Sequence, residues 1–167
     1  NRIEGIRLDN CLPYQLQALT PDPAEQYTGK GIANVNDQKK AGLYYKSPAW
    51  LGFQGEMVVA ELALAEAVDT FTCVVSCLEN QGSWIFAPTR VEVWAATDGT
   101  PYNLVAQLTM MEPEPKAIGP LFVRLAGQCK GCRFLQVKIQ PLAALPDWHP
   151  GAGEAAWLFV DEILIKI

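Results

Sequence analysis

The sequence predicts an all-β protein built as a sandwich of antiparallel strands. Segments of roughly five to ten residues rich in Val, Ile, Phe, Tyr and Thr recur from residue 57 to the last residue, with Gly, Pro, Asn and Asp between them. Helical signals are few. Residues 61–68 have helical propensity but are short and uncapped, so we expect strand in their first half and a turn in the second. The chain has 167 residues, half of them apolar, which suits one buried core.

Alternation between apolar and polar residues places the individual strands. An extended chain over residues 69–78 puts every second side chain on one apolar face, namely Phe71, Cys73, Val75 and Cys77. The Asp-Gly pair at residues 98–99 is typical of a hairpin turn, so residues 102–110 should return antiparallel to residues 89–96. Residues 111–120 contain three prolines and are predicted as a loop. The predicted strands are residues 57–64, 69–78, 89–96, 102–110, 121–125, 132–140 and 157–167.

Charge and hydropathy exclude several classes of protein. The chain carries 13 Lys and Arg against 18 Asp and Glu, a net charge of −5, so no nucleic-acid partner is expected. The longest apolar stretches, such as residues 57–65, are far shorter than the roughly 20 residues that cross a bilayer, so no membrane-spanning segment is expected. Residues 1–9 hold two acids and two Arg and show no signal-peptide pattern.

The five cysteines favour buried thiols over a metal centre. Cys11 stands alone, while Cys73 and Cys77 lie four residues apart in a predicted strand, where roughly 13 Å would separate them. That separation is too large for both to bind one tetrahedral zinc ion, so we expect two buried thiols. Cys129 and Cys132 flank a short turn without the strand-to-helix context of a redox motif, and a disulfide between them stays open if the protein is exported.

The sequence contains no motif that is typical of an enzyme active site. The single histidine, His149, excludes sites built on two histidines. No Gly-x-Ser-x-Gly motif positions a nucleophile, no phosphate-binding Gly-rich loop is present, and the carboxylates are scattered along the chain. A Ser-His-Asp arrangement or a carboxylate pair formed only in space stays open, but we expect a noncatalytic protein.

Several phrases that occur in order resemble one family of domains. They are residues 50–55 (WLGFQG), 84–88 (WIFAP), 97–99 (TDG), 148–153 (WHPGAG) and 157–163 (WLFVDEI). Together they resemble discoidin-like domains, of the coagulation factor V/VIII C-type and galactose-binding-like group, as found at the C-terminus of bacterial family 20 β-N-acetylhexosaminidases from gut Bacteroidetes. Family 32 carbohydrate-binding modules are of the same kind. The resemblance covers residues 27–167, which leaves residues 1–26 as a lead-in strand or linker.

The resemblance implies a jelly-roll β-sandwich of about eight main strands with a structural calcium ion (Ca²⁺) at one edge. Its calcium ligands would correspond here to Asp37 and Glu162. Two carboxylates with backbone carbonyls of a tight turn suit calcium, which takes six to eight oxygen ligands. Gln38 stands where the family has Gly, which changes the turn. Without calcium, Asp37 would be a turn residue and Glu162 a solvated or ion-paired strand residue.

The candidate sugar-binding residues lie in two loops. Aromatic faces stack on sugar C–H surfaces and planar polar groups bind hydroxyls, so exposed loop aromatics with polar neighbours are the residues to examine. The candidates are Asn80, Gln81, Trp84, Trp148 and His149. The alternative is that the two tryptophans fill the core and that His149 satisfies a loop carbonyl. For Trp50 and Trp157, which have apolar neighbours, we favour the core.

The resemblance therefore implies a noncatalytic carbohydrate-binding or accessory module of an exported bacterial glycoside hydrolase. Galactose- or N-acetylhexosamine-type glycans would be its ligands, the parent's catalytic domain its partner, and the periplasm, cell surface or medium its location. The alternative is a structural module that packs against its parent enzyme and binds nothing, and Glu92 and Trp94 on an outward strand face are candidates for such docking.

Overall fold

The computed structural model describes residues 10–116 and 118–167. These residues form seven antiparallel strands and three short 3₁₀ helices, which confirms the all-β prediction. Residues 1–9 of the predicted lead-in segment lie outside the described residues, and β1 lies in the remainder of that segment. The strands are β1 (Tyr14–Thr20), β2 (Leu51–Gln54), β3 (Val58–Glu79), β4 (Arg90–Ala96), β5 (Asn103–Thr109), β6 (Gly119–Gln140) and β7 (Trp157–Lys166); the helices are η1 (Glu25–Tyr27), η2 (Ile32–Asn36) and η3 (Gln81–Ser83).

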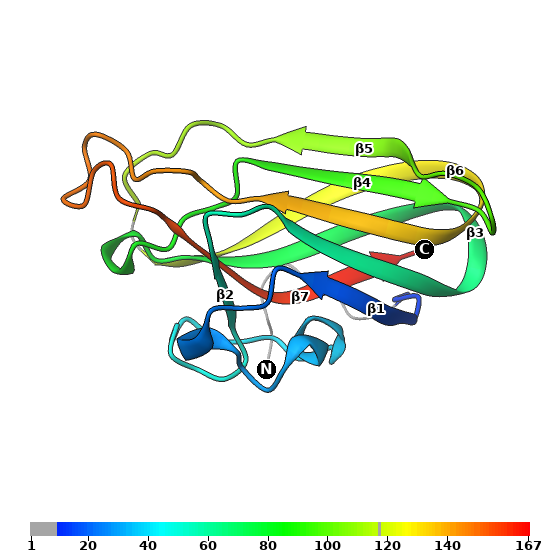
Figure 1. The fold of residues 1–167 in the computed structure, drawn as a ribbon, viewed down its shortest axis with the longest axis horizontal. Helices are drawn as coiled ribbons and strands as arrows, with labels where there is room; N and C mark the ends of the chain where they lie inside the picture. The colour runs from blue at the N-terminus through cyan, green and yellow to red at the C-terminus, as the bar shows by residue number, and fades with distance from the viewer. Residues whose placement is uncertain (1–9, 117) are drawn as a thin grey trace.

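Strands β3 and β6 pair along their length as one ribbon that bends from one layer of the sandwich into the other (Figure 1). The first part of β3 pairs with β1 and with the second part of β6, which continues to β4 and β5. The second part of β3 pairs with the first part of β6 and with β7, which continues to β2. About eight strands were expected, and the described residues form seven, two of which contribute to both layers.

The bend in this ribbon explains where the predicted strand boundaries differ from the observed ones. The register of β3 on β6 is interrupted between Ala63 and Thr70, where most side chains are exposed. We expected a turn after residue 64 and separate strands at residues 121–125 and 132–140. Pairing continues through the bend instead, because bulges let two paired strands kink without ending.

The inward face of β3 follows the predicted alternation. Phe71, Cys73, Val75 and Cys77 are all buried in the main core between the layers. Both cysteines are free thiols, and burial raises the pKa of Cys73 to about 12. The interpretation of Cys73 and Cys77 as buried structural thiols is therefore confirmed. Cys129 and Cys132 are also free thiols.

The layer that contains β7 is buried on both faces. Leu158 faces the main core, whereas Phe159 belongs to a second cluster on the opposite face, with Trp50. Trp50 is buried there as predicted, whereas Trp157 is only partly buried against the cluster. Gly52 is needed there, because a Cβ at this position would lie 2.7 Å from the Cβ of Tyr27. The segment between β1 and β2 thus covers the outer face of this layer (Figure 1).

A one-residue β-bulge in β7 determines how its two acidic residues point. Cys77 pairs with Val160 and Ser76 pairs with Glu162, so Asp161 is the extra residue. Val160 and Ile163 both face the main core. Asp161 and Glu162, although adjacent, therefore both point to the outer face, toward the segment that follows η2.

No helix among the residues that the structure describes is long and apolar enough to cross a membrane.

Candidate functional site

The five predicted sugar-binding residues come together at one end of the sandwich. Asn80, Gln81 and Trp84 lie in the β3–β4 connection, and Trp148 and His149 lie in the β6–β7 connection. A hydrogen bond between His149 and Gln81 joins the two loops across 68 positions of sequence. We call these five residues the loop-end cluster.

His149 is the buried centre of the loop-end cluster. Its Nδ1 accepts a hydrogen bond from the backbone N–H of Gly151 at 3.0 Å. A neutral imidazole with an acceptor at Nδ1 carries its proton on Nε2. The other ring nitrogen therefore donates to the backbone carbonyl of Gln81, at an N–O distance of 2.6 Å. His149 thus satisfies a loop carbonyl, as the alternative interpretation expected, and both of its ring nitrogens are used within the protein.

Two tryptophans pack against this histidine and are partly exposed to solvent. Trp84 is 37% exposed and Trp148 is 44% exposed. The ring centroid of His149 lies 6.4 Å from that of Trp84 and 6.0 Å from that of Trp148, with edge-on geometry in both pairs. Phe86 also packs against Trp148, at 6.1 Å between ring centroids. The cluster therefore presents two partly exposed aromatic rings that pack against a buried histidine.

The local backbone explains why Trp84 projects outward. It ends η3 in the left-handed region, at φ 66°. Gly151 passes under its ring so closely that a Cβ there would lie 2.8 Å from Cζ2 of Trp84. A side chain at Gly151 would displace the indole ring, so this glycine is part of the platform.

Asn80 and Gln81 are buried and act within the protein. Asn80 caps η3, because its side-chain oxygen accepts a hydrogen bond from the backbone N–H of Ser83 at 3.3 Å. Gln81 donates through Nε2 to the carbonyl of Glu114 and accepts through Oε1 from the N–H of Lys116, at 2.9 and 2.8 Å. We therefore expect the side chains of Asn80 and Gln81 to position the loops. Contact between the sugar and the exposed tryptophans remains a prediction.

A pocket that the sequence reasoning missed lies beside Gln81. It has a volume of about 260 Å³ and opens between the β3–β4 connection and the proline-rich loop before β6. Two of its lining residues form an ion pair, with 3.5 Å between Nζ of Lys116 and Oε1 of Glu79. In the sequence, the signal that could have indicated this pocket was the pair of adjacent methionines before the prolines. The walls include Pro88, Met110, Pro113 and Leu142.

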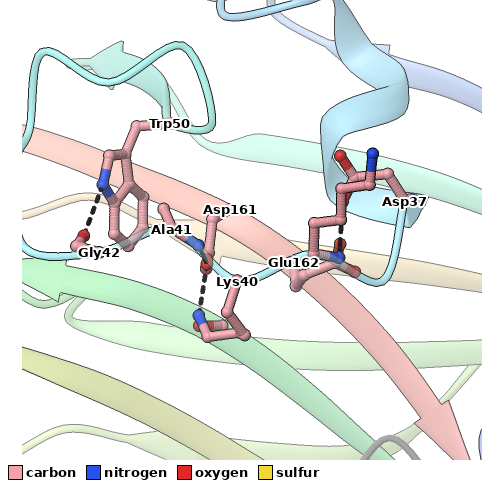
Figure 2. Close-up of polar contacts among 9 residues, drawn as sticks. Asp37, Lys40, Ala41, Gly42, Trp50, Asp161 and Glu162 are labelled. Carbon is pink, nitrogen blue, oxygen red and sulfur yellow. Dashed lines mark hydrogen bonds and ion pairs between the residues drawn. The ribbon is translucent and has the colours of Figure 1, made fainter. Parts of the chain in front are cut away.

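The predicted calcium ligands also lie close together (Figure 2). The backbone N–H of Lys39 lies 2.9 Å from Oδ1 of Asp37 and 3.0 Å from Oε1 of Glu162, so one donor holds both carboxyl groups. Burial raises the pKa of Glu162 to about 10, with a further contribution from the carboxyl group of Asp37. The second oxygen of Glu162, Oε2, is buried without a hydrogen-bond partner among the described residues.

Asp37 and Glu162 would supply two of the six to eight oxygen ligands that a calcium ion takes. Two converging carboxyl groups, one with an unpartnered buried oxygen, are what a calcium ion would satisfy. Gln38 takes a φ of 56°, so the turn keeps the left-handed conformation that glycine would favour. The described residues contain no group of three or more His, Cys, Asp or Glu side chains suited to a metal. Backbone carbonyls or water would have to complete the shell.

Comparison with solved structures identifies the fold. The C-terminal domain of a chitobiase from Bacteroides fragilis aligns with 94% of this chain and 95% of its own length, at a TM-score of 0.55 and 14% identity. A family 32 carbohydrate-binding module from Clostridium perfringens, solved with GalNAc-β-1,3-galactose, aligns with 94% of this chain and 99% of its own length, at a TM-score of 0.56 and 10% identity. The chain therefore has the discoidin-like β-sandwich fold that its sequence resembles.

The same fold occurs in proteins with other tasks. The N-terminal domain of a single-strand break repair protein aligns with 93% of this chain and 99% of its own length, at a TM-score of 0.51 and 8% identity. No protein-family model and no curated protein sequence matches this chain. Function must therefore be argued from the residues of the sites.

Proposed function

We propose that the protein is a noncatalytic carbohydrate-binding module and that the two exposed tryptophans of the loop-end cluster contact the sugar. The observation that carries this proposal is the pair of exposed tryptophans, Trp84 and Trp148, fixed by the buried His149 at one end of the sandwich. Aromatic faces in a fixed orientation bind the C–H surfaces of sugars at little entropic cost. Modules of the same fold that were solved with galactose and with GalNAc-β-1,3-galactose support this choice of ligand class.

The proposed ligands are galactose- or N-acetylhexosamine-type glycans, and the proposed context is an exported bacterial glycoside hydrolase. Such a protein would work in the periplasm, at the cell surface or in the medium. The module would raise the local concentration of the attached catalytic domain on glycan through weak and reversible contacts. The net charge of −5 is compatible with neutral glycans.

We further propose that Asp37 and Glu162 hold a structural calcium ion. The ion would neutralise two crowded carboxyl groups and give Oε2 of Glu162 a partner. Because Asp37 follows η2 and Glu162 lies on β7, calcium would fasten the segment after η2 to the sandwich. Adding calcium to chelator-treated protein should raise its melting temperature, whereas Asp37→Asn should weaken this response. An unchanged melting temperature together with no calcium in elemental analysis would contradict the proposal.

Calorimetric titration with galactose, N-acetylgalactosamine and N-acetylglucosamine tests the sugar site. Trp84→Ala and Trp148→Ala should each weaken binding by roughly two- to tenfold, because each removes a stacking surface worth about 0.5–1.5 kcal/mol. Trp94→Ala is the matched control. Trp94 is a half-buried tryptophan on the outer face of β4, where its Nε1 bonds Glu92 at 2.9 Å. Equal affinity for sugar in all four proteins, or no binding to any glycan on an array, would refute the site.

The alternative function, a packing module without a ligand, has one supporting observation. Strand β5 is at the edge of its sheet and exposes Leu104 and Leu108, which are 40% and 38% accessible. A catalytic domain seated there would cover these side chains. A free domain that is monomeric and binds sugar would contradict this alternative.

A further inference from the structure

A lysine, an aspartate and a serine are buried together next to the bulge of β7. The ammonium group of Lys40 contacts the carboxylate of Asp161 (Figure 2). It also contacts the hydroxyl of Ser76. The side chains of Lys40 and Asp161 are 3% and 0% exposed. The Lys40 Nζ also lies 5.7 Å from the ring centroid of Trp50 and 5.2 Å from that of Phe122. The pair is thus enclosed by aromatic rings and sheet backbone.

The hydrogen bonds of Asp161 are uneven between its two oxygens. Oδ2 meets Lys40 and also accepts the backbone N–H of Ala41 at 2.8 Å. Oδ1 is buried and has no hydrogen-bond partner among the described residues. An unpartnered oxygen on a buried carboxylate is costly, and a buried ion pair recovers its desolvation cost only when its remaining polar atoms are satisfied.

We propose that Lys40 and Asp161 become joined by an intramolecular amide bond between Nζ and Cγ. A proton first passes from the ammonium group to the carboxylate, which leaves a neutral amine and a carboxylic acid. The amine lone pair attacks Cγ, the Cγ–Oδ1 bond breaks, and Oδ1 leaves as water with two of the three ammonium protons. No oxidant, reductant or other reactant is needed.

The surrounding groups suit each part of this step. Holding amine and carboxyl in fixed contact supplies the orientation that a reaction between free molecules lacks. The N–H of Ala41 points at Oδ2 and would stabilise the negative charge that develops on it during attack. Exclusion of water favours condensation over hydrolysis, and the product replaces two buried charges with one neutral amide.

The product would leave no polar atom of these side chains without a partner. Oδ2 becomes the amide oxygen and keeps the N–H of Ala41, while the amide N–H can donate to Ser76. The oxygen that leaves is Oδ1, the one without a partner. The new bond would link positions 121 residues apart and fasten the segment after η2 covalently to β7.

Mass spectrometry of the reduced, denatured wild-type protein tests this inference directly. The intact mass should fall below the sequence mass by one water molecule, and a tryptic digest should contain one cross-linked species that holds both Lys40 and Asp161. Trypsin should also fail to cut after Lys40. An intact mass equal to the sequence mass would overturn the proposal, and the two residues would then be an ordinary buried ion pair.

A second source of the same mass change needs to be separated. The Asp98-Gly99 turn can lose water by forming a cyclic imide, so a loss that maps to that peptide would also overturn the proposal. Lys40→Met should restore the full sequence mass and lower the melting temperature. Lys39→Met is the matched control and should keep the loss of water, because only the backbone of Lys39 contacts the carboxyl groups. If Lys40→Met does not fold, the wild-type digest still decides, and it does so independently of any sugar binding.

Discussion

Replacing His149 with alanine is the most informative perturbation of the loop-end cluster. The imidazole is buried at 6% exposure and makes two hydrogen bonds, one to the carbonyl of Gln81 and one from the N–H of Gly151. The Gln81 carbonyl keeps a second donor, the N–H of Trp84 at 3.0 Å, but the N–H of Gly151 loses its partner. An unsatisfied donor costs about 1–3 kcal/mol and a lost hydrogen bond about 1 kcal/mol. We therefore expect the free energy of unfolding to fall by roughly 2–4 kcal/mol.

Urea denaturation followed by tryptophan fluorescence measures this loss. Asp147→Ala, an exposed change in the same loop, is the control and should leave the midpoint nearly unchanged. His149→Ala should also lose sugar affinity, because Trp84 and Trp148 both pack against the imidazole ring. A stability loss below about 0.5 kcal/mol would refute the view that His149 holds the two loops together.

Three further outcomes follow from the packing. Gly127→Ala should lower the melting temperature, because a Cβ there would lie 2.5 Å from the buried ring of Phe71; an unchanged temperature in a thermal scan would contradict this. Cys73 and Cys77 should resist a thiol reagent in the native protein and react after unfolding, since with a pKa of about 12 only about one Cys73 thiol in ten thousand is ionised at about pH 8. Gln81→Ala should speed tryptic cleavage in the proline-rich loop, since two backbone groups lose their partner; equal cleavage rates would show that the loop does not depend on it.

The strands were predictable where apolar residues recur at every second position. The alternation of Phe71 to Cys77 and the Asp-Gly turn after β4 are local patterns, and the structure follows both. Short-range patterns could not show that β3 and β6 stay paired through a bend, because the residues near Ala67 are polar or small and suit a turn equally well. Continuation there depends on pairing with a strand more than 50 residues away.

The convergence of the loop-end cluster could be anticipated only through family resemblance. Nothing local links His149 to Gln81, whose contact spans 68 positions. Residue type left Trp84 and Trp148 open between a core and a surface position, and the structure shows that both are partly exposed. The buried positions of Asn80 and Gln81 were not predictable, because their partners are backbone groups of other loop residues.

The acids of β7 show how one inserted residue changes what a strand can do. Strict alternation would send either Asp161 or Glu162 into the apolar core, where an unpaired charge is too costly to keep. The bulge turns both outward, and each then meets its own backbone donor, Ala41 for Asp161 and Lys39 for Glu162. Because the two donors are separate, the calcium proposal and the amide proposal can fail independently. A chelator would remove only the ion proposed at Asp37 and Glu162, whereas a loss of water that maps to the cross-linked peptide depends only on Lys40 and Asp161.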